Sequence, residues 1–209
     1  MGYKEITLKL PTGYEDGELK KNIKKELGIS DFSYQIENKS LDARKKSNIH
    51  WLVRIAVMSD QINEPDRQAP PALDIPFRKR DEKIVVVGSG PAGFFSAFVL
   101  QKAGFSVTLI ERGADASKRA DGIRAFENTG KFDPMGNYAF GEGGAGSYSD
   151  GKLFSRRNNN SSIVNQVLKT FVQFGAPPEI EYISKPHLGT DVLCEIVKNI
   201  RRHIIQHGG

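Results

Sequence analysis

A glycine-rich hexapeptide, Gly88-Ser-Gly90-Pro-Ala-Gly93, constrains the fold of this chain more than any other segment. It directly follows the apolar run Ile84–Val87 and opens a segment with helical character. Alone, a GxGxxG pattern is a weak signal, but between a strand and a helix it is typical of a nucleotide-binding βαβ unit. Gly88 permits the tight turn, Gly90 lets a pyrophosphate approach the backbone, and Gly93 lets the helix pack close to the strand.

The residues after this helix continue the pattern. Ser106–Ile110 predicts a second strand, and Glu111 stands at its end, 18 residues after Gly93. A carboxylate there can accept both ribose hydroxyls of an adenosine, and it repels the 2′-phosphate of NADP. The wholly β-branched run Ile84–Val87 predicts a parallel strand buried on both faces. FAD and NAD share this half of the pattern, so it does not choose between them.

A second glycine-rich segment, Gly141–Leu153, is open to misreading. Its first part formally repeats GxGxxG, but no apolar strand leads into it and no apolar helix follows. Gly146–Lys152 formally matches GxxxxGK, yet Leu153 stands where a P-loop needs a Ser or Thr hydroxyl for Mg²⁺. A nucleoside triphosphatase is therefore not indicated. The remaining interpretations are a flexible loop, or a loop rich in backbone N–H groups that lies against a flat ring or a phosphate.

Three regions follow from the hydrophobic pattern. Residues 5–10, 17–27, 32–36 and 51–57 predict strand, helix, strand and strand, which favours a small α+β domain of ferredoxin-like type over residues 1–58. Residues 59–82 contain four prolines among polar groups and predict a linker. Residues 83–209 form the expected α/β Rossmann-like domain, incomplete at its C-terminal end.

Within that third region we expect a long irregular stretch after residue 113, followed by two helices. The first spans about 162–174, with Ile163, Val167, Phe171 and Phe174 facing inward and Gly175 ending it. The second runs from Thr190 as N-cap to Gln206. Its expected inward residues are Leu193, Ile196, Val197, Ile200 and Ile204.

Composition excludes several classes of protein. The net charge of +5 comes from 30 basic and 25 acidic residues, spread over both halves, so a dedicated nucleic-acid-binding protein is not expected. The single cysteine, Cys194, cannot form an internal disulfide, and no metal site is expected from the scattered His50, His187, His203 and His207. No apolar run approaches the roughly 18 residues of a membrane span. Without a secretory h-region at the N-terminus, we expect a cytoplasmic location and no membrane partner.

Several segments together resemble FAD-dependent dehydrogenases of the glutathione-reductase-like NAD(P)/FAD-dependent oxidoreductase superfamily. The matching segments are Val86–Gly93, Glu111–Gly113, Phe140–Gly146 with Ser149–Leu153, Gly175–Ile180, Lys185–Asp191 and the N-terminal Ser40–Lys46. The resemblance implies FAD with its pyrophosphate on Gly88–Gly93, its ribose on Glu111 and its flavin near the second glycine-rich segment. The cofactor-binding residues expected in this way are Gly88, Ser89, Gly90, Pro91, Ala92, Gly93, Glu111, Arg112, Gly144, Ala145, Gly146, Ser149 and Asp150.

The function expected from this resemblance is the FAD-binding part of a flavin-dependent oxidoreductase that acts by hydride transfer on an unknown small-molecule substrate. No catalytic residue is identified; His187 is a candidate acid or base, although a lone histidine after proline is more often a packing residue. Family members look more than twice as long, which implies an N-terminal fragment whose partner is the C-terminal half of the same protein. The alternatives are an NAD-binding dehydrogenase and a non-catalytic nucleotide- or RNA-binding module.

Overall fold

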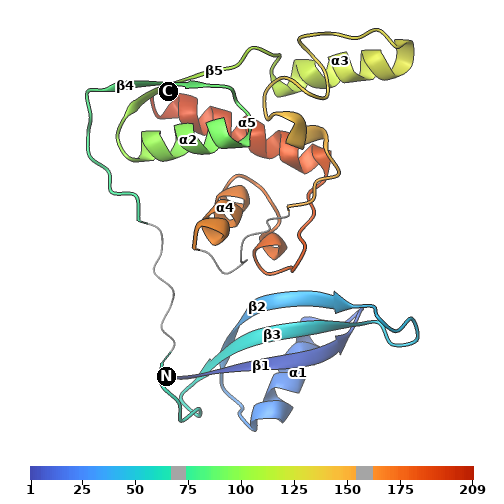
Figure 1. The fold of residues 1–209 in the computed structure, drawn as a ribbon. Coiled ribbons are helices and arrows are strands. Elements are labelled where there is room, and N and C mark those ends of the chain that lie inside the picture. The colour runs from blue at the N-terminus through green and yellow to red at the C-terminus, as the bar shows by residue number, and fades with distance from the viewer. Residues whose placement is uncertain (67–73, 154–161) are drawn as a thin grey trace. The chain divides into compact units, whose positions relative to one another are not determined.

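The structure, a computed structural model, describes residues 1–66, 74–153 and 162–209 (Figure 1). The chain divides into two compact units. The first comprises Met1–Pro71 with Glu179–Pro186, and the second comprises Ala72–Pro178 with His187–Gly209. No helix in the described ranges is long and apolar enough to cross a membrane.

The first unit is a three-stranded antiparallel sheet with one helix on it (Figure 1). Its elements are β1 (Gly2–Pro11), α1 (Asp16–Leu27), β2 (Ser33–Asp42) and β3 (His50–Ser59), and β3 is the central strand. The alternating apolar residues of β1 and β3 pack against Leu19 and Ile23 of α1. The predicted order of strand, helix, strand and strand is confirmed.

The strand order β1-β3-β2 makes this a split βαβ arrangement, which is one half of the ferredoxin-like pattern. A second helix of similar length and a fourth long strand are not found among the described residues of this unit. The ferredoxin-like type therefore stays a prediction.

A distant segment of the chain adds to the free edge of β2. The Lys39 N–H donates to the Tyr182 carbonyl at 2.8 Å, and the Ser184 N–H donates to the Lys39 carbonyl at 3.0 Å. Lys39 and Ile183 thereby form a parallel bridge. Residues 182–184 belong to the third region in the prediction, because local periodicity carries no signal for such a long-range pairing.

The predicted linker joins β3 to β4 (Lys83–Val87). In its described parts, residues 60–66 and 74–82, the chain has no helix or strand. Residues 67–73, which contain Pro70 and Pro71, lie outside the described residues. The assignment of a linker stays a prediction.

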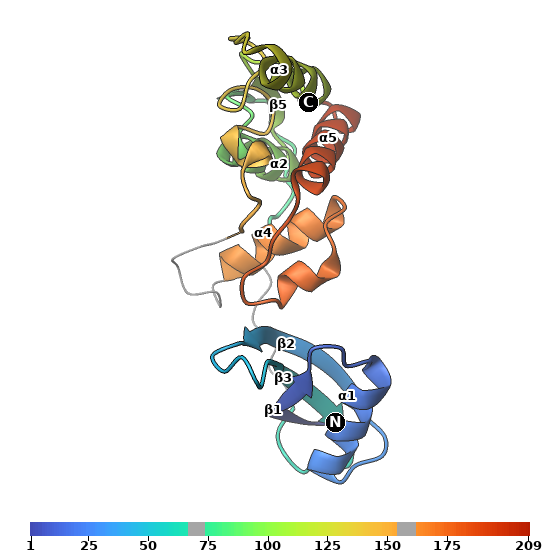
Figure 2. The same cartoon turned by 90° about the vertical axis from the view of Figure 1, so that its right-hand side faces the viewer.

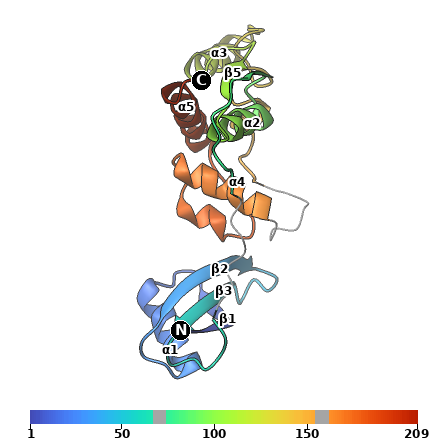
Figure 3. The ribbon, with the colours of Figure 1, turned by 90° about the vertical axis from the view of Figure 1, so that its left-hand side faces the viewer.

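The second unit is built on the predicted βαβ unit. β4 and β5 (Ser106–Ile110) pair in parallel, with Val85 opposite Thr108, and α2 (Pro91–Lys102) connects them. α5 (Thr190–Gln206) lies beside α2 in both views, and Gln101 of α2 donates to the Ile204 carbonyl of α5 at 2.7 Å (Figures 2 and 3). The core between these elements consists of Phe94, Ala97, Phe98, Val107, Ile196, Val197, Ile200 and Ile204.

The prediction that β4 is buried on both faces is wrong in this structure. Val85 and Val87 are 58% and 82% exposed, and Ile110 of β5 is 49% exposed. Ile84 and Val86, on the opposite face, are half-buried, and Val86 lies beside Gly93 of α2. Burial on both faces needs helices on both sides of a sheet, and among the described residues the contacts of this sheet are with α2.

The expectation of a long irregular stretch after residue 113 is also wrong, because α3 (Ala116–Thr129) forms there. The Asp115 side chain caps this helix by accepting hydrogen bonds from the N–H groups of Ser117 and Lys118. Gly130, at φ 71°, ends it. The helix has no continuous apolar stripe, and one of its buried side chains is Arg119, so hydrophobic periodicity did not reveal it. A short 3-10 helix, η1 (Ala145–Tyr148), follows in the second glycine-rich segment.

The two C-terminal helices form with small differences from expectation. α4 spans Ser162–Gln173, but Ile163 is 57% exposed rather than inward-facing. Gly175, at φ 110°, follows α4, and a short 3-10 helix, η2 (Pro178–Glu181), lies between α4 and α5. The N-cap of α5 is Gly189, not Thr190, which is the first helical residue.

Candidate functional site

The first glycine turn connects β4 to α2 through a left-handed residue. Gly88 has φ +93°, and its N–H donates to the Ile110 carbonyl of β5 at 2.7 Å. A Cβ on Gly93 would lie 1.8 Å from the Gly88 carbonyl oxygen, so the helix can approach the strand only with glycine at this position. Gly90 is the N-cap of α2, Pro91 is its first residue, and no side chain caps it. The backbone N–H groups and the positive end of the helix dipole are thus presented to a ligand.

The space in front of Gly90 is open. A Cβ on this residue would have only the Gly144 Cα, at 4.0 Å, within van der Waals reach. A bulky group such as a pyrophosphate can therefore approach the Gly90 backbone, and a side chain at this position would occupy that room. This geometry fits a dinucleotide.

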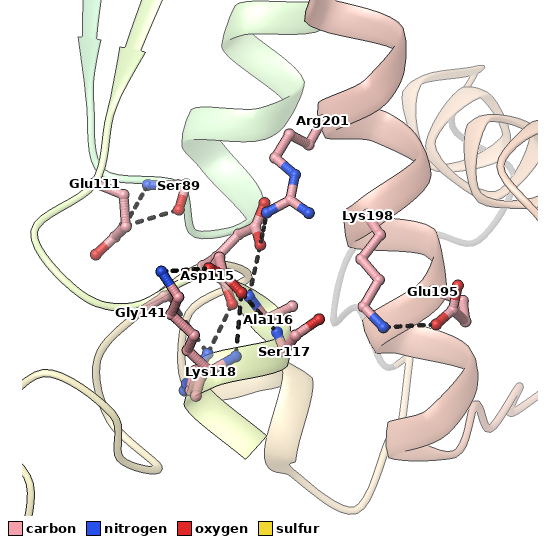
Figure 4. Close-up of polar contacts among 12 residues, drawn as sticks. Ser89, Glu111, Asp115, Ala116, Ser117, Lys118, Gly141, Glu195, Lys198 and Arg201 are labelled. Carbon is pink, nitrogen blue, oxygen red and sulfur yellow. Dashed lines mark hydrogen bonds and ion pairs between the residues drawn. The ribbon is translucent and has the colours of Figure 1, made fainter. Parts of the chain in front are cut away.

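Glu111 lies beside the first glycine turn and bonds to it. Its carboxylate accepts hydrogen bonds from the Ser89 N–H and Oγ, each at 2.8 Å (Figure 4). It also accepts from the Gly113 N–H at 2.8 Å. Burial raises the pKa of this carboxyl, but the hydrogen bonds from Ser89 and Gly113 outweigh burial and hold the pKa below its usual value. The Arg112 backbone N–H also lowers the pKa of Glu111, so this carboxylate is surrounded by N–H and O–H donors of the two loops. The neighbouring Arg112 stacks its guanidinium over the Phe140 ring at 4.5 Å.

The second glycine-rich segment lies directly against the first glycine turn. The Gly143 N–H donates to the Ser89 carbonyl at 2.9 Å, and a Cβ on Gly144 would lie 3.2 Å from the Gly90 Cα. Gly143 and Gly144 have φ of +88° and +68°, a conformation that favours glycine. The fold therefore brings together the two motifs that the sequence separates by about fifty residues.

The other predicted cofactor-binding residues of this segment lie farther along it, in η1 and beyond. Ala145 and Gly146 lie in η1, and the Ser149 Oγ donates to the Gly146 carbonyl at 2.8 Å. Asp150 forms an exposed ion pair with Lys152 at 2.5 Å, and this hydrogen bond lowers the pKa of the Asp150 carboxyl. His187 is exposed and forms an antiparallel bridge with Lys152. The charge of His187 also contributes to lowering the pKa of Asp150, so the two side chains lie near each other.

Three charged residues that no sequence motif indicated hold the site together. Arg119 of α3 is fully buried and bonds to the backbone of the second glycine-rich segment. Glu142 is buried and accepts hydrogen bonds from the Ala116 N–H at 2.7 Å and from Arg201 at 2.8 Å. Burial raises the pKa of the Glu142 carboxyl, although the bonds from Ala116 and Arg201 oppose the rise. No spacing rule pointed to these residues.

Figure 4 shows how Arg201, the partner of Glu142, lies relative to α3. Arg201 projects from α5 toward the start of α3, where Asp115, Ala116 and Ser117 lie. The ion pair between Arg201 and Glu142 therefore ties α5 to the first turn of α3. As a result, the N-terminal end of the second glycine-rich segment is anchored to both α3 and α5.

Two clefts border the glycine loops. The larger, about 460 Å³, begins at Pro91 and Gly143 and runs between α4 and α5, with almost wholly apolar walls. Its lining includes Phe94, Phe95, Gly146, Ser149, Val167, Phe171, Leu193 and Ile196. The smaller, about 350 Å³, lies beside Ser89 and Glu111. Both volumes are in the range of small-molecule sites. In the ranges that the structure describes, no cluster of His, Cys, Asp and Glu could hold a metal ion.

Two segments of the chain match known family models. Residues 86–143 match the family model of the NAD(P)-binding Rossmann-like domain. Residues 3–58 match a domain of unknown function (DUF8436). The first match covers the end of β4, the glycine turn, α2, β5, α3 and the start of the second glycine-rich segment.

Two longer proteins are similar to this chain. An uncharacterized protein of Clostridium beijerinckii is 38% identical over 206 residues, which cover 91% of this chain and 38% of that protein. The glutamate synthase [NADPH] small chain of Bacillus subtilis is 44% identical over 52 residues, which cover 25% of this chain and 10% of that protein. The chain thus spans less than half the length of these relatives. Together with the geometry, the matches support a Rossmann-like, redox-type nucleotide-binding domain in the second unit.

Proposed function

We propose that this chain is the FAD-binding part of a flavin-dependent oxidoreductase. The observation that carries the proposal is the meeting of the two glycine loops at the N-terminus of α2, where Gly143 bonds to Ser89. The meeting point lies between a carboxylate suited to a ribose, Glu111, and an apolar cleft of about 460 Å³. A dinucleotide with one polar end and one flat apolar end fits this order of carboxylate, glycine loops and apolar cleft.

Each part of the site has a role in this proposal. The open backbone at Gly90 and the uncapped end of α2 bind the pyrophosphate. Glu111 accepts from the ribose, and Gly146 and Ser149 form the polar rim of the cleft that takes the flavin ring. When bound, FAD supplies the hydride acceptor or donor, while the protein orients it and excludes water. The substrate is a small molecule, and the longer relatives suggest that a C-terminal half completes its site.

NAD is the second candidate, because residues 86–143 match an NAD(P)-binding domain. The same turn and the same carboxylate would bind its adenosine half. The Glu111 carboxylate would repel the additional 2′-phosphate of NADP. A non-catalytic RNA-binding module has no comparable support, because basic and acidic residues are nearly balanced in number.

An absorption spectrum of the purified chain tests the proposal. The protein is mixed with FAD, separated from excess cofactor and scanned through the visible range, while ADP and NAD are titrated separately by calorimetry. Flavin absorption bands that remain after the separation support FAD as the cofactor of this chain. Binding of ADP without retained flavin supports the nucleotide site alone and assigns the flavin ring to residues outside this chain. Tighter binding of NAD than of FAD would overturn the choice of cofactor, and binding of neither nucleotide would overturn the site.

A further inference from the structure

Arg119 occupies an unusual position for a charged residue. It lies on α3 with no exposed surface, and its guanidinium makes five hydrogen bonds. All of them end on backbone carbonyl oxygens of one loop, at Asn137 (2.8 Å), Tyr138 (2.8 Å), Gly141 (3.4 Å), Glu142 (2.9 Å) and Gly144 (2.7 Å). The side chain thus determines the path of the second glycine-rich segment.

The positive charge of Arg119 is not paired with a carboxylate among the described residues. The guanidinium lies 4.7 Å from the centre of the Tyr148 ring, and burial raises the pKa of that phenol to about 12, so the ring is neutral. Burial lowers the pKa of Arg119; Tyr148, Cys194 and Glu111 oppose this effect, and Glu111 is the carboxylate among them. The oxygens of Glu111, however, are bonded to Ser89 and Gly113. Arginine stays protonated at neutral pH in any case.

Only one loop separates this charge from the proposed pyrophosphate site. The Gly144 carbonyl accepts from Arg119, while the Gly144 Cα lies next to Gly90. The adjacent Gly143 N–H bonds to Ser89. Burying an unpaired charge is costly, so a fold that retains one gains if an anionic ligand binds nearby.

We propose that Arg119 is a positioning residue of the nucleotide site, which holds the second glycine loop against the first and supplies the positive charge that favours a pyrophosphate there. This inference rests on the proposed nucleotide-binding function. It adds a residue outside both glycine motifs, and it predicts that the site prefers a charged nucleotide to an uncharged nucleoside.

The test compares the affinities of ADP and adenosine by calorimetry in the wild type, Arg119→Met and Arg119→Lys. Arg124→Met is the matched control, because Arg124 lies on the same helix in an exposed pair with Asp121. We expect Arg119→Met to lower the ADP affinity roughly tenfold more than the adenosine affinity, the size of effect for a unit charge acting across one loop. The control should leave both affinities unchanged. Circular dichroism verifies that each variant is folded.

Arg119→Lys provides a second readout that does not depend on folding of the Met variant. A buried lysine loses its charge as pH rises, whereas arginine does not. The preference of this variant for ADP over adenosine should therefore fall with rising pH, while that of the wild type stays constant over the same range. A purely structural role would give no such pH dependence.

The outcomes separate this inference from the proposed function. If the wild type binds ADP and both variants keep its preference for ADP over adenosine at every pH, the inference is wrong and the nucleotide site stands. Arg119→Met could lose ADP and adenosine affinity equally, and the preference of Arg119→Lys for ADP over adenosine could stay constant with pH. Together, these results would show that Arg119 has only a structural role. If the wild type binds neither compound, the proposed function itself is wrong.

Discussion

Gly90 and Gly93 lie on the same turn, yet a methyl group would meet very different surroundings at the two positions. At Gly90 the nearest atom to a Cβ is 4.0 Å away, whereas at Gly93 a Cβ would lie 1.8 Å from the Gly88 carbonyl oxygen. We expect Gly93→Ala to lower the free energy of unfolding by about 1–3 kcal/mol through overpacking. Gly90→Ala should change it by less than about 1 kcal/mol but weaken nucleotide binding.

Urea unfolding followed by circular dichroism, together with ADP titration, measures both effects in this pair of variants. The two substitutions add the same group, so they serve as controls for each other. Unchanged ADP binding in Gly90→Ala would show that the ligand does not approach this backbone.

Glu111 links the stability of the glycine turn to pH. Its pKa is lowered in the folded state from the ordinary value of 4.5, so its contribution is present above that pH and is lost as pH falls through the folded-state pKa. We expect Glu111→Ala to lower the free energy of unfolding at pH 7 by about 1–3 kcal/mol, because the Ser89 and Gly113 N–H groups lose their acceptor. The difference from wild type should shrink at pH 3.

Urea unfolding of wild type and variant at both pH values checks this expectation, with the exposed Glu82→Ala as control. Glu142 has the opposite sign, since burial raises its pKa, and the Glu111 charge adds to that rise, so the comparison also includes a smaller contribution through Glu142. A difference that is constant between pH 7 and pH 3 would contradict the assigned role of the Glu111 charge.

At the scale of elements, the β4–β5 sheet has one buried and one exposed face. Val107 is buried under α2, whereas Val87 is 82% exposed. Val87→Thr keeps the shape and β-branching and should change the free energy of unfolding by less than about 0.5 kcal/mol. Val107→Thr buries a hydroxyl group and should cost about 1–3 kcal/mol. Urea unfolding followed by circular dichroism measures both, and equal costs would mean that the outer face is covered in solution.

At the scale of the whole molecule, residues 182–184 bond to the edge of β2, although more than 140 residues separate them along the chain. Ser184→Pro removes the N–H that donates to the Lys39 carbonyl at 3.0 Å. We expect this change to lower the unfolding free energy of the first unit by about 0.5–1.5 kcal/mol. The only tryptophan, Trp51, lies in β3, so its fluorescence reports on this unit.

Ser184→Ala is the control, because it keeps the N–H and loses only the hydrogen bond of the Ser184 Oγ with Asn38, at 3.0 Å. The midpoint of urea unfolding followed by Trp51 fluorescence should be lower in Ser184→Pro than in Ser184→Ala. Equal midpoints would show that the pairing of residues 182–184 with β2 does not stabilise the first unit.

Local sequence was sufficient for the elements that surround the first glycine turn. The apolar runs Ile84–Val87 and Ser106–Ile110, with the glycine pattern between them, predicted β4, α2 and β5 close to their observed bounds. The alternating and helical periods of the first unit likewise predicted its four elements. In each case neighbouring residues along the chain carry the whole signal, because strand and helix periods are local properties.

Local sequence was insufficient to predict that α3 forms, or which face of the β4–β5 sheet is covered by helices. α3 depends on the Asp115 cap and on burial of a polar residue, Arg119, rather than on an apolar stripe. Exposure of Val87 depends on which helices reach the sheet, and the residues of β4 alone do not encode that.

The amino-acid sequence alone established the βαβ unit, the glycine turn and the carboxylate at the end of β5. The tertiary structure alone decided that Gly143 meets Ser89, that Arg119 holds the second glycine loop, and that Ser184 pairs with Lys39. The physical reason is the range of the contacts. The side-chain periods of a helix or strand are read from neighbouring residues, whereas hydrogen bonds between distant residues depend on how the whole chain packs.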